Sequence, residues 1–332
     1  MGERISIISK VKEAGHHFSK TLIGERTTAF IESQTKLDED GKITVVDEAL
    51  GVLKHCIAPG VKESITNIAV GYIQSGKTLS YSTLSTLAAD NGFRVIIYLT
   101  GVTTSLNNQT YGRIKRDLNV NETDWYAIFE DNPKNIDTDI TLVANYLKYS
   151  KITLLFPAMK QQQHIERLTQ LFSNYKIKNL LENVGVLIID DEADQASFNT
   201  YAKKNKDRPD WEEDEQSRIY SCILKLRSVF PSLSYIQYTA TPQAAFLIDS
   251  NDDLSPKYHT VLTPGKGYTG GRVFFVERFN DLIVEIKDLY DKDNNPIYPE
   301  SLNDALMQFI ISVSILVYIK RDKNINLNSA TL

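Results

Sequence analysis

The feature of this chain that most restricts its fold is a series of short apolar runs separated by stretches with helical spacing. Helical spacing is found at residues 77–90, 106–118 and 161–175, and the apolar runs cover residues 67–71, 94–99, 152–156, 184–190 and 234–239. Strands that are apolar almost throughout are typical of a parallel sheet with helices on both faces. The sequence therefore predicts an α/β fold, a parallel sheet flanked by helices, preceded by an N-terminal helical segment.

The composition fits a folded protein of this kind and excludes several other classes. The 332 residues are 42% hydrophobic, with 37 basic and 42 acidic side chains and a net charge of −5. Such values exclude disordered, collagen-like and disulfide-scaffold chains. The mild acidity argues against a purely electrostatic nucleic-acid binder but allows a local basic groove. Cys56 and Cys222 lie far apart in the sequence, so we expect no disulfide framework and a reducing, cytoplasmic location.

We expect three regions along the chain: a helical segment at 1–60, the sheet domain at 61–254, and a linker with the start of a further helical region at 255–332. Within the first region, residues 44–58 have the spacing of an amphipathic helix. The charged run at 203–218 contains a proline and predicts an exposed insertion. The stretch at 255–271 is rich in Pro, Gly and Tyr and predicts an extended linker that leaves the sheet.

Residues 305–319 are apolar enough to be compared with a membrane span. They are fewer than the roughly 20 residues that a bilayer requires, and they include Gln308, Ser312 and Ser314. We therefore expect a helix of the protein core and no membrane partner. Because such a helix needs a surface to pack against, we also expect the chain to be part of a longer protein.

The strongest functional signal is the pattern G-x-x-x-x-G-K-T, which follows the first expected strand and opens the first expected helix of the sheet domain. Glycines allow the backbone N–H groups to turn inward toward phosphates, and the helix N-terminus favours negative charge. Lys77 would reach the β and γ phosphates, and Thr78 would offer its hydroxyl to Mg²⁺. The pattern predicts that ATP and Mg²⁺ bind at Gly71, Gln74, Ser75, Gly76, Lys77 and Thr78.

A cluster of acids follows the fourth apolar run, in the sequence L-I-I-D-D-E-A-D at 187–194. The carboxyl ends of parallel strands are where ligands bind in open α/β sheets. We assign Asp191 to Mg²⁺ and Glu192 to the activation of the attacking water, since phosphoryl transfer to water needs both functions. Asp190 remains a competing metal ligand, because a shift of one residue along a strand changes which acid faces the phosphates.

The sequence T-A-T-P follows the fifth apolar run. The hydroxyls of Thr239 and Thr241 could hydrogen-bond the acidic turn and couple the bound nucleotide to a neighbouring domain. This pattern is weak alone and gains meaning from its position after the other two.

In this order, the three motifs resemble the first motor domain of superfamily-two helicases and translocases. The resemblance implies a RecA-like P-loop domain at 61–254. It also implies that Thr103, Thr104 and Gln109 contact nucleic acid, because the segment 98–109 ends in the family's L-x-x-Q. The proline and arginine that usually precede that pattern are absent, and these side chains could instead cap the next helix.

A narrower resemblance is to the bacterial Z-one domain family, on residues 71–78, 190–197, 199, 238–243 and 264–271. Members are commonly labelled endonucleases, but their motifs are those of a helicase-like ATPase. They are encoded in restriction-like and phage-defence gene clusters, often beside a MutL-type ATPase. The resemblance implies DNA, a MutL-type ATPase or a nuclease as partners. It also implies a second motor domain that supplies an arginine finger, so this chain alone should hydrolyse ATP poorly.

Three functions therefore stay open. The first is an ATP-hydrolysing, helicase-like DNA motor of a bacterial defence or restriction-like system. The second is an endonuclease, for which the chain offers only the acid-x-Lys pattern of Glu285 and Lys287, without a convincing partner acid. The third is a nucleotide-gated scaffold that does not translocate.

Overall fold

The computed structural model describes residues 21–72, 76–194, 215–248, 252–266, 268–282, 286, 288–290 and 295–322. The chain divides into two compact units, the first ending at Tyr268 and the second beginning at Thr269. Each unit is described by itself.

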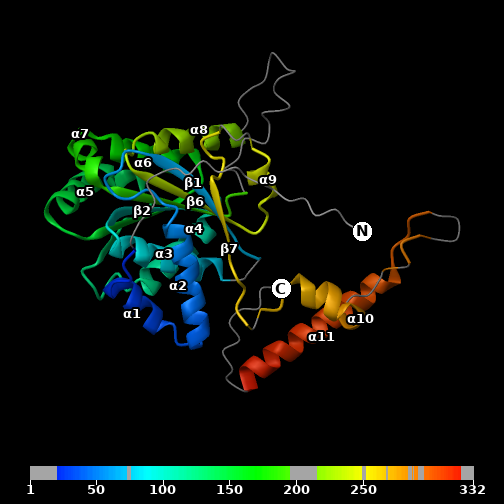
Figure 1. Cartoon of the computed structure of the whole chain (residues 1–332). Helices are drawn as coiled ribbons and strands as arrows, with labels where there is room; N and C mark the ends of the chain where they lie inside the picture. Colours follow the sequence, from blue (N-terminus) through cyan, green and yellow to red (C-terminus); the bar gives the residue numbers. More distant parts are fainter. Residues whose placement is uncertain are drawn as a thin grey trace, which may run out of the picture. The chain divides into compact units, whose positions relative to one another are not determined.

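The first unit is built on a sheet of seven strands (Figure 1). Every strand pair in this sheet is parallel, as the sequence predicts. The fold class is therefore confirmed as α/β. The spatial order is β3-β4-β2-β5-β6-β1-β7. The bounds are β1 Ser64–Val70, β2 Phe93–Thr100, β3 Tyr126–Ile128, β4 Thr153–Met159, β5 Gly185–Asp191, β6 Leu233–Thr239 and β7 Tyr258–Val261.

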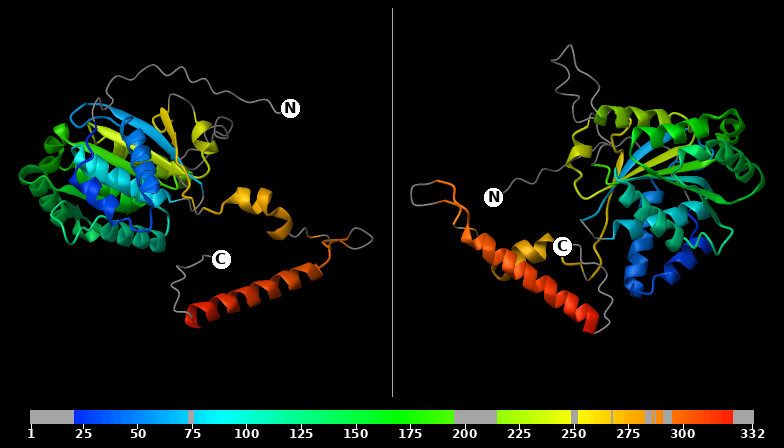
Figure 2. Two further views of the ribbon diagram at one scale, coloured as in Figure 1. Left: turned by 60° about the horizontal axis from the view of Figure 1, so that its bottom comes forward. Right: turned by 180° about the vertical axis from the view of Figure 1, so that it is seen from behind.

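Helices cover both faces of the sheet, in two separate layers (Figures 1 and 2). One layer holds α1 (Glu25–Ser33), α2 (Glu39–Leu53), α3 (Lys77–Asp90) and α4 (Thr104–Asp117), and the other holds α5 (Ile136–Tyr149), α6 (Gln162–Ser173), α7 (Tyr175–Lys178) and α8 (Glu215–Arg227).

Alternate residues of the central strands pack under the two layers. In β5, Val186 and Ile188 belong to the apolar cluster with α5, α6 and α8, whereas Leu187 and Ile189 belong to the cluster with α2, α3 and α4. Side chains that alternate between two buried faces explain why these strands are apolar at nearly every position.

The N-terminal region contributes to the same core, because α1 and α2 both pack against α3. The helix expected at 44–58 is α2, and it begins earlier, at Glu39. Asp38 caps this helix, since its carboxylate accepts a hydrogen bond of 2.8 Å from the Gly41 N–H. This cap was not identified in the sequence.

The stretch at 255–271, expected to be a linker, instead supplies an edge strand. β7 pairs in parallel with the outer edge of β1, with Tyr258 opposite Asn67 and Val261 opposite Val70. The residues of β7 are only partly buried, so the segment lacks the apolar run by which central strands are recognised. Residues 203–214 of the expected insertion lie outside the described residues, and its last part belongs to α8.

The second unit contains a π-helical turn at Val273–Glu277, α10 (Phe279–Leu282) and α11 (Glu300–Asp322). The apolar stretch expected in a protein core lies in α11. Most of the side chains described in this stretch are exposed, including those of Leu306, Ile310 and Ile315. Of the described residues, Glu300–Ile319 form the one helix long and apolar enough to cross a membrane, with a mean hydropathy of 1.7.

Candidate nucleotide-binding site

Strand order brings the three predicted motifs together at one edge of the sheet. β5, β6 and β1 are adjacent, and their ends are in register, with Asp191 opposite Tyr238 and Val70 opposite Thr239. Because the strands are parallel, their carboxyl ends meet at the same edge. The glycine-rich segment, the acidic turn and the Thr-Ala-Thr segment are therefore spatial neighbours.

The described parts of the glycine-rich segment have the backbone that a phosphate loop needs. The Gly71 N–H donates to the carbonyl of Thr239 at 3.0 Å, which ties the loop to β6. Gly76 lies at a φ of +98° and caps α3, a conformation that glycine adopts without steric cost. The predicted contacts Gln74 and Ser75 lie outside the described residues.

Lys77 and Glu192 face each other across this edge. Their Nζ and Oε1 atoms are 3.3 Å apart, and the Lys77 side chain is only 10% exposed, against 40% for Glu192. Glu192 itself has a φ of +54°, a left-handed conformation that costs energy in a residue with a side chain. This bend directs the predicted water-activating carboxylate toward the predicted phosphate-binding lysine.

Asp191 occupies the last position of β5 and is partly buried. Burial raises the pKa of its carboxyl to about 6, helped by the neighbouring charge of Glu192 and opposed by Lys160 and Lys77. A carboxylate that is poorly solvated when charged gains from a nearby cation. This property suits the predicted role of Asp191 as a Mg²⁺ ligand.

Asp190 lies in a different environment and does not fit the alternative role of metal ligand. Its side chain is fully buried and paired with Lys160, Oδ1 to Nζ, at 2.9 Å. The Tyr235 hydroxyl donates to its other oxygen at 2.6 Å. Since the side chains of successive strand residues point to opposite faces of the sheet, those of Asp190 and Asp191 point in different directions. The geometry therefore favours Asp191 for the metal.

The Thr-Ala-Thr segment clamps the last acid of the turn. The hydroxyl of Thr239 donates to Asp194 Oδ1 at 2.7 Å, and that of Thr241 donates to Oδ2 at 2.6 Å. Burial alone would raise the pKa of Asp194, but the hydrogen bonds from Thr241 and Thr239 hold it below its usual value. The predicted hydrogen bonds between these hydroxyls and the acidic turn are confirmed.

Lys160 is the residue that the sequence analysis missed. It follows β4 directly, its side chain is buried, and its Nζ donates at 2.7 Å to the carbonyls of both Asp191 and Glu192. In the sequence it lies between the apolar run at 152–156 and the helix expected at 161–175, and no role was assigned to it. The signal that could have identified it is a lysine at the carboxyl end of one buried strand, combined with a second acid, Asp190, inside another.

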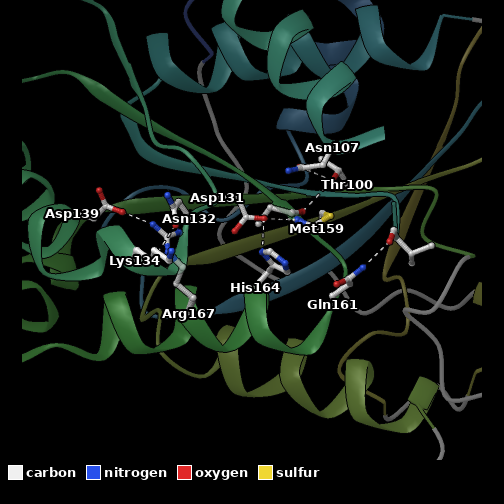
Figure 3. A network of polar contacts seen from close by, with 12 residues as sticks. Thr100, Asn107, Asp131, Asn132, Lys134, Asp139, Met159, Gln161, His164 and Arg167 are labelled. Carbon is white, nitrogen blue, oxygen red and sulfur yellow. Dashed lines mark hydrogen bonds and ion pairs between the residues drawn. The ribbon is translucent and has the colours of Figure 1, made fainter. Parts of the chain in front are cut away.

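The predicted nucleic-acid contacts lie at and after the start of α4. Thr103 uses its hydroxyl as the helix cap, accepting from the Leu106 N–H at 3.4 Å, whereas Thr104 and Gln109 are exposed. The loop before them is held by Gln161, whose side-chain amide donates to the Val102 carbonyl at 2.8 Å (Figure 3). The structure thus shows the capping role of Thr103, and contact with nucleic acid stays a prediction.

A wider polar network supports this edge of the sheet (Figure 3). Asp131 accepts from the Met159 N–H at 3.0 Å and lies 2.8 Å from the ring of His164. On the neighbouring strand, the Thr100 hydroxyl donates to the buried Asn107 at 2.9 Å. These contacts anchor the starts of α4 and α6.

The described residues contain no cluster of three or more His, Cys, Asp or Glu side chains that could hold a metal ion by themselves. Mg²⁺ is commonly bound by one or two protein groups together with phosphate oxygens and water. The hydroxyl of Thr78 and the carboxylate of Asp191 fit such a shared site, in which the nucleotide supplies the remaining ligands.

Neither a protein-family model nor a curated protein sequence matches this chain. Among solved structures, the DUF1998 helicase MrfA bound to DNA and AMPPNP matches with a TM-score of 0.42 and 16% identity, over 75% of this chain and 30% of the helicase chain. Another structure of the DUF1998 helicase MrfA matches with a TM-score of 0.44 and 14% identity, over 93% of this chain and 42% of the helicase chain. Cdc6p from Pyrobaculum aerophilum matches with a TM-score of 0.32 and 12% identity, over 82% of this chain and 57% of the Cdc6p chain. The chain thus spans less than half of the helicase it matches.

Proposed function

We propose that this chain contains the nucleotide-binding domain of an ATP-driven, helicase-like motor that acts on DNA. The main support is the approach of Lys77 to Glu192, within 3.3 Å, at the edge where β1 and β5 end. A lysine from a glycine-rich loop and a carboxylate from an acidic turn are the pair that binds a terminal phosphate and orients water against it.

Each residue has a distinct task in this proposal. The N-terminus of α3 and Lys77 bind the β and γ phosphates, and Thr78 and Asp191 would hold Mg²⁺, which neutralises phosphate charge. Glu192 orients the attacking water and accepts its proton. Thr239 and Thr241, through Asp194, connect the acidic turn to the segment that follows β6.

The full motor activity needs more than this site. Superfamily-two resemblance implies a second domain with an arginine finger, which can be worth about 10³ to 10⁵ in rate. We therefore expect this chain to bind ATP well and to hydrolyse it slowly. The narrower assignment to the Z-one domain family, with its defence-system partners and cytoplasmic location, stays a prediction.

The test is ATP binding and hydrolysis by the wild type, Lys77→Ala and Glu192→Gln, each with and without duplex or single-stranded DNA. We expect Lys77→Ala to lose ATP binding and Glu192→Gln to keep binding while losing turnover. The controls are Lys176→Ala and Glu122→Gln, which make the same charge changes at exposed positions away from this edge. Wild-type behaviour in both site variants would refute the proposal.

The same assays separate the alternatives. Stimulation of hydrolysis by DNA, weakening as salt rises, favours a motor over a nucleotide-gated scaffold. The two residues proposed for a nuclease, Glu285 and Lys287, lie outside the described residues. Cleavage of plasmid DNA with Mg²⁺ that persists in Lys77→Ala would favour the nuclease.

A further inference from the structure

Lys160 is a fully buried lysine beside the acidic turn of the proposed site. Its side chain and that of Asp190 are both 0% exposed. A buried charge is unfavourable unless it is paired and hydrogen-bonded. A lysine in such a position therefore needs a specific arrangement of acceptors around it.

That arrangement is present. The protonated amine of lysine can only donate hydrogen bonds. Lys160 Nζ donates to the carbonyl oxygens of Asp191 and Glu192 at 2.7 Å each, and it forms an ion pair with Asp190 Oδ1 at 2.9 Å. The carboxylate compensates the charge. The two carbonyls belong to the residues that we assign to the metal and to the attacking water.

The two carbonyls flank the point where the chain leaves β5 and turns. Glu192 has a φ of +54° there, which is unfavourable for a residue with a side chain and persists only where its surroundings impose it. On its far side the turn is fixed by the Ala193 N–H, which donates to the Tyr238 carbonyl at 3.0 Å. Lys160, which directly follows β4, restrains the turn through its hydrogen bonds to the two carbonyls.

We propose that Lys160 is a positioning residue for Glu192. Its ammonium holds the carbonyls of the acidic turn, and this keeps Glu192 in the left-handed conformation from which its carboxylate faces Lys77. The effect of Lys160 on ATP hydrolysis rests on the proposed function. The restraint of Lys160 on the turn does not, because it can be measured without any nucleotide.

The test uses the double variant Lys160→Met with Asp190→Asn, which removes both buried charges together and so avoids leaving either one unpaired. The matched control is Tyr235→Phe, which deletes the 2.6 Å hydrogen bond to Asp190 and leaves every Lys160 contact in place. Circular dichroism and urea unfolding establish that both variants fold.

The first measurement is hydrogen exchange at the backbone amides of 191–194. We expect exchange at Ala193 to be faster by about tenfold or more in the double variant and unchanged in Tyr235→Phe, because only the double variant releases the turn. Unchanged exchange in the double variant would overturn the proposal, whether or not the chain hydrolyses ATP.

The second measurement is single-turnover ATP hydrolysis. We expect the double variant to bind ATP within about threefold of the wild type and to lose roughly 10²-fold in rate, the lower end of what a positioned base contributes. Adding Glu192→Gln should then cause no further loss, since groups that act as a unit are not additive. A full additional loss from Glu192→Gln would show that Lys160 acts independently of Glu192 and would overturn the positioning role.

Discussion

Replacing Asp191 by asparagine should make the nucleotide-free protein more stable at neutral pH. The folded protein raises the pKa of this carboxyl from 3.8 to about 6, chiefly because burial disfavours its charge. At pH 7.5 the wild type must keep that charge in a partly buried position. Asparagine has nearly the same shape and no charge, so the penalty disappears.

The magnitude follows from the pKa shift. The difference between 3.8 and about 6, at about 1.4 kcal/mol per unit, gives about 3 kcal/mol at pH 7.5. Between these two pKa values the native state binds more protons than the unfolded chain, so the free energy of unfolding of the wild type falls as pH rises. The contribution of the protonated carboxyl is fully present below pH 3.8 and lost as pH rises through 6. The excess stability of Asp191→Asn over the wild type should therefore fall to about half at pH 5 and vanish below pH 3.8.

The assay is urea unfolding of both proteins at pH 7.5 and pH 5 without nucleotide, followed by Mg²⁺-dependent ATP binding, which the variant should lose. Asp194→Asn, three positions along, is the matched comparison. The pKa of Asp194 is lowered, so its charge stabilises the fold above the unfolded pKa, and this variant should be less stable than the wild type at pH 7.5. Equal or lower stability of Asp191→Asn at pH 7.5 would refute the reasoning.

Three further predictions concern glycine backbones, the hydroxyl of Thr239 and the side-chain amide of Gln161. Gly76→Ala should lower the free energy of unfolding by about 1–2 kcal/mol, because its backbone is left-handed and open space around the position leaves no steric clash to add to this cost. Gly112→Ala, inside α4 with equally open space, should raise the free energy of unfolding by about 0.5–1 kcal/mol. Urea unfolding compares the two variants. Thr239→Val should lose about 1.5–3 kcal/mol at pH 7.5, since its hydroxyl bonds the charged Asp194, and lose less at low pH, where that carboxyl is protonated. Gln161→Ala releases the Val102 loop and should reduce stimulation of hydrolysis by DNA while leaving basal turnover unchanged; equal stimulation in both proteins would contradict this link.

Much of the fold was readable from local patterns. The expected helix at 77–90 has the bounds of α3, and each of the five apolar runs is a strand of the parallel sheet. These segments were predictable because a strand buried on both faces must be apolar throughout, and a glycine-rich turn before a helix is a local feature. β3 and β7 were missed, since they are short edge strands without an apolar run.

In the candidate site too, some features could be predicted from the local sequence and others could not. The sequence by itself determined the residue types of the phosphate loop, the acidic turn and the Thr-Ala-Thr segment, because each follows directly from the end of an apolar run. It could not decide between Asp190 and Asp191, since a strand sequence does not say which face meets the ligand. Burial of Asp190 against Lys160 favours Asp191 as the metal ligand, and that assignment stays a prediction.

Only the tertiary structure brought Lys160 to the acidic turn. β4 and β5 are not neighbours in the sheet, because β2 lies between them, yet the Lys160 side chain reaches the carbonyls of Asp191 and Glu192. Such a contact depends on strand order and on the direction of a long side chain, neither of which is encoded by residues adjacent in sequence. The sequence determined which groups can do the chemistry, and the packing of the sheet determined which of them meet and in what conformation they are held.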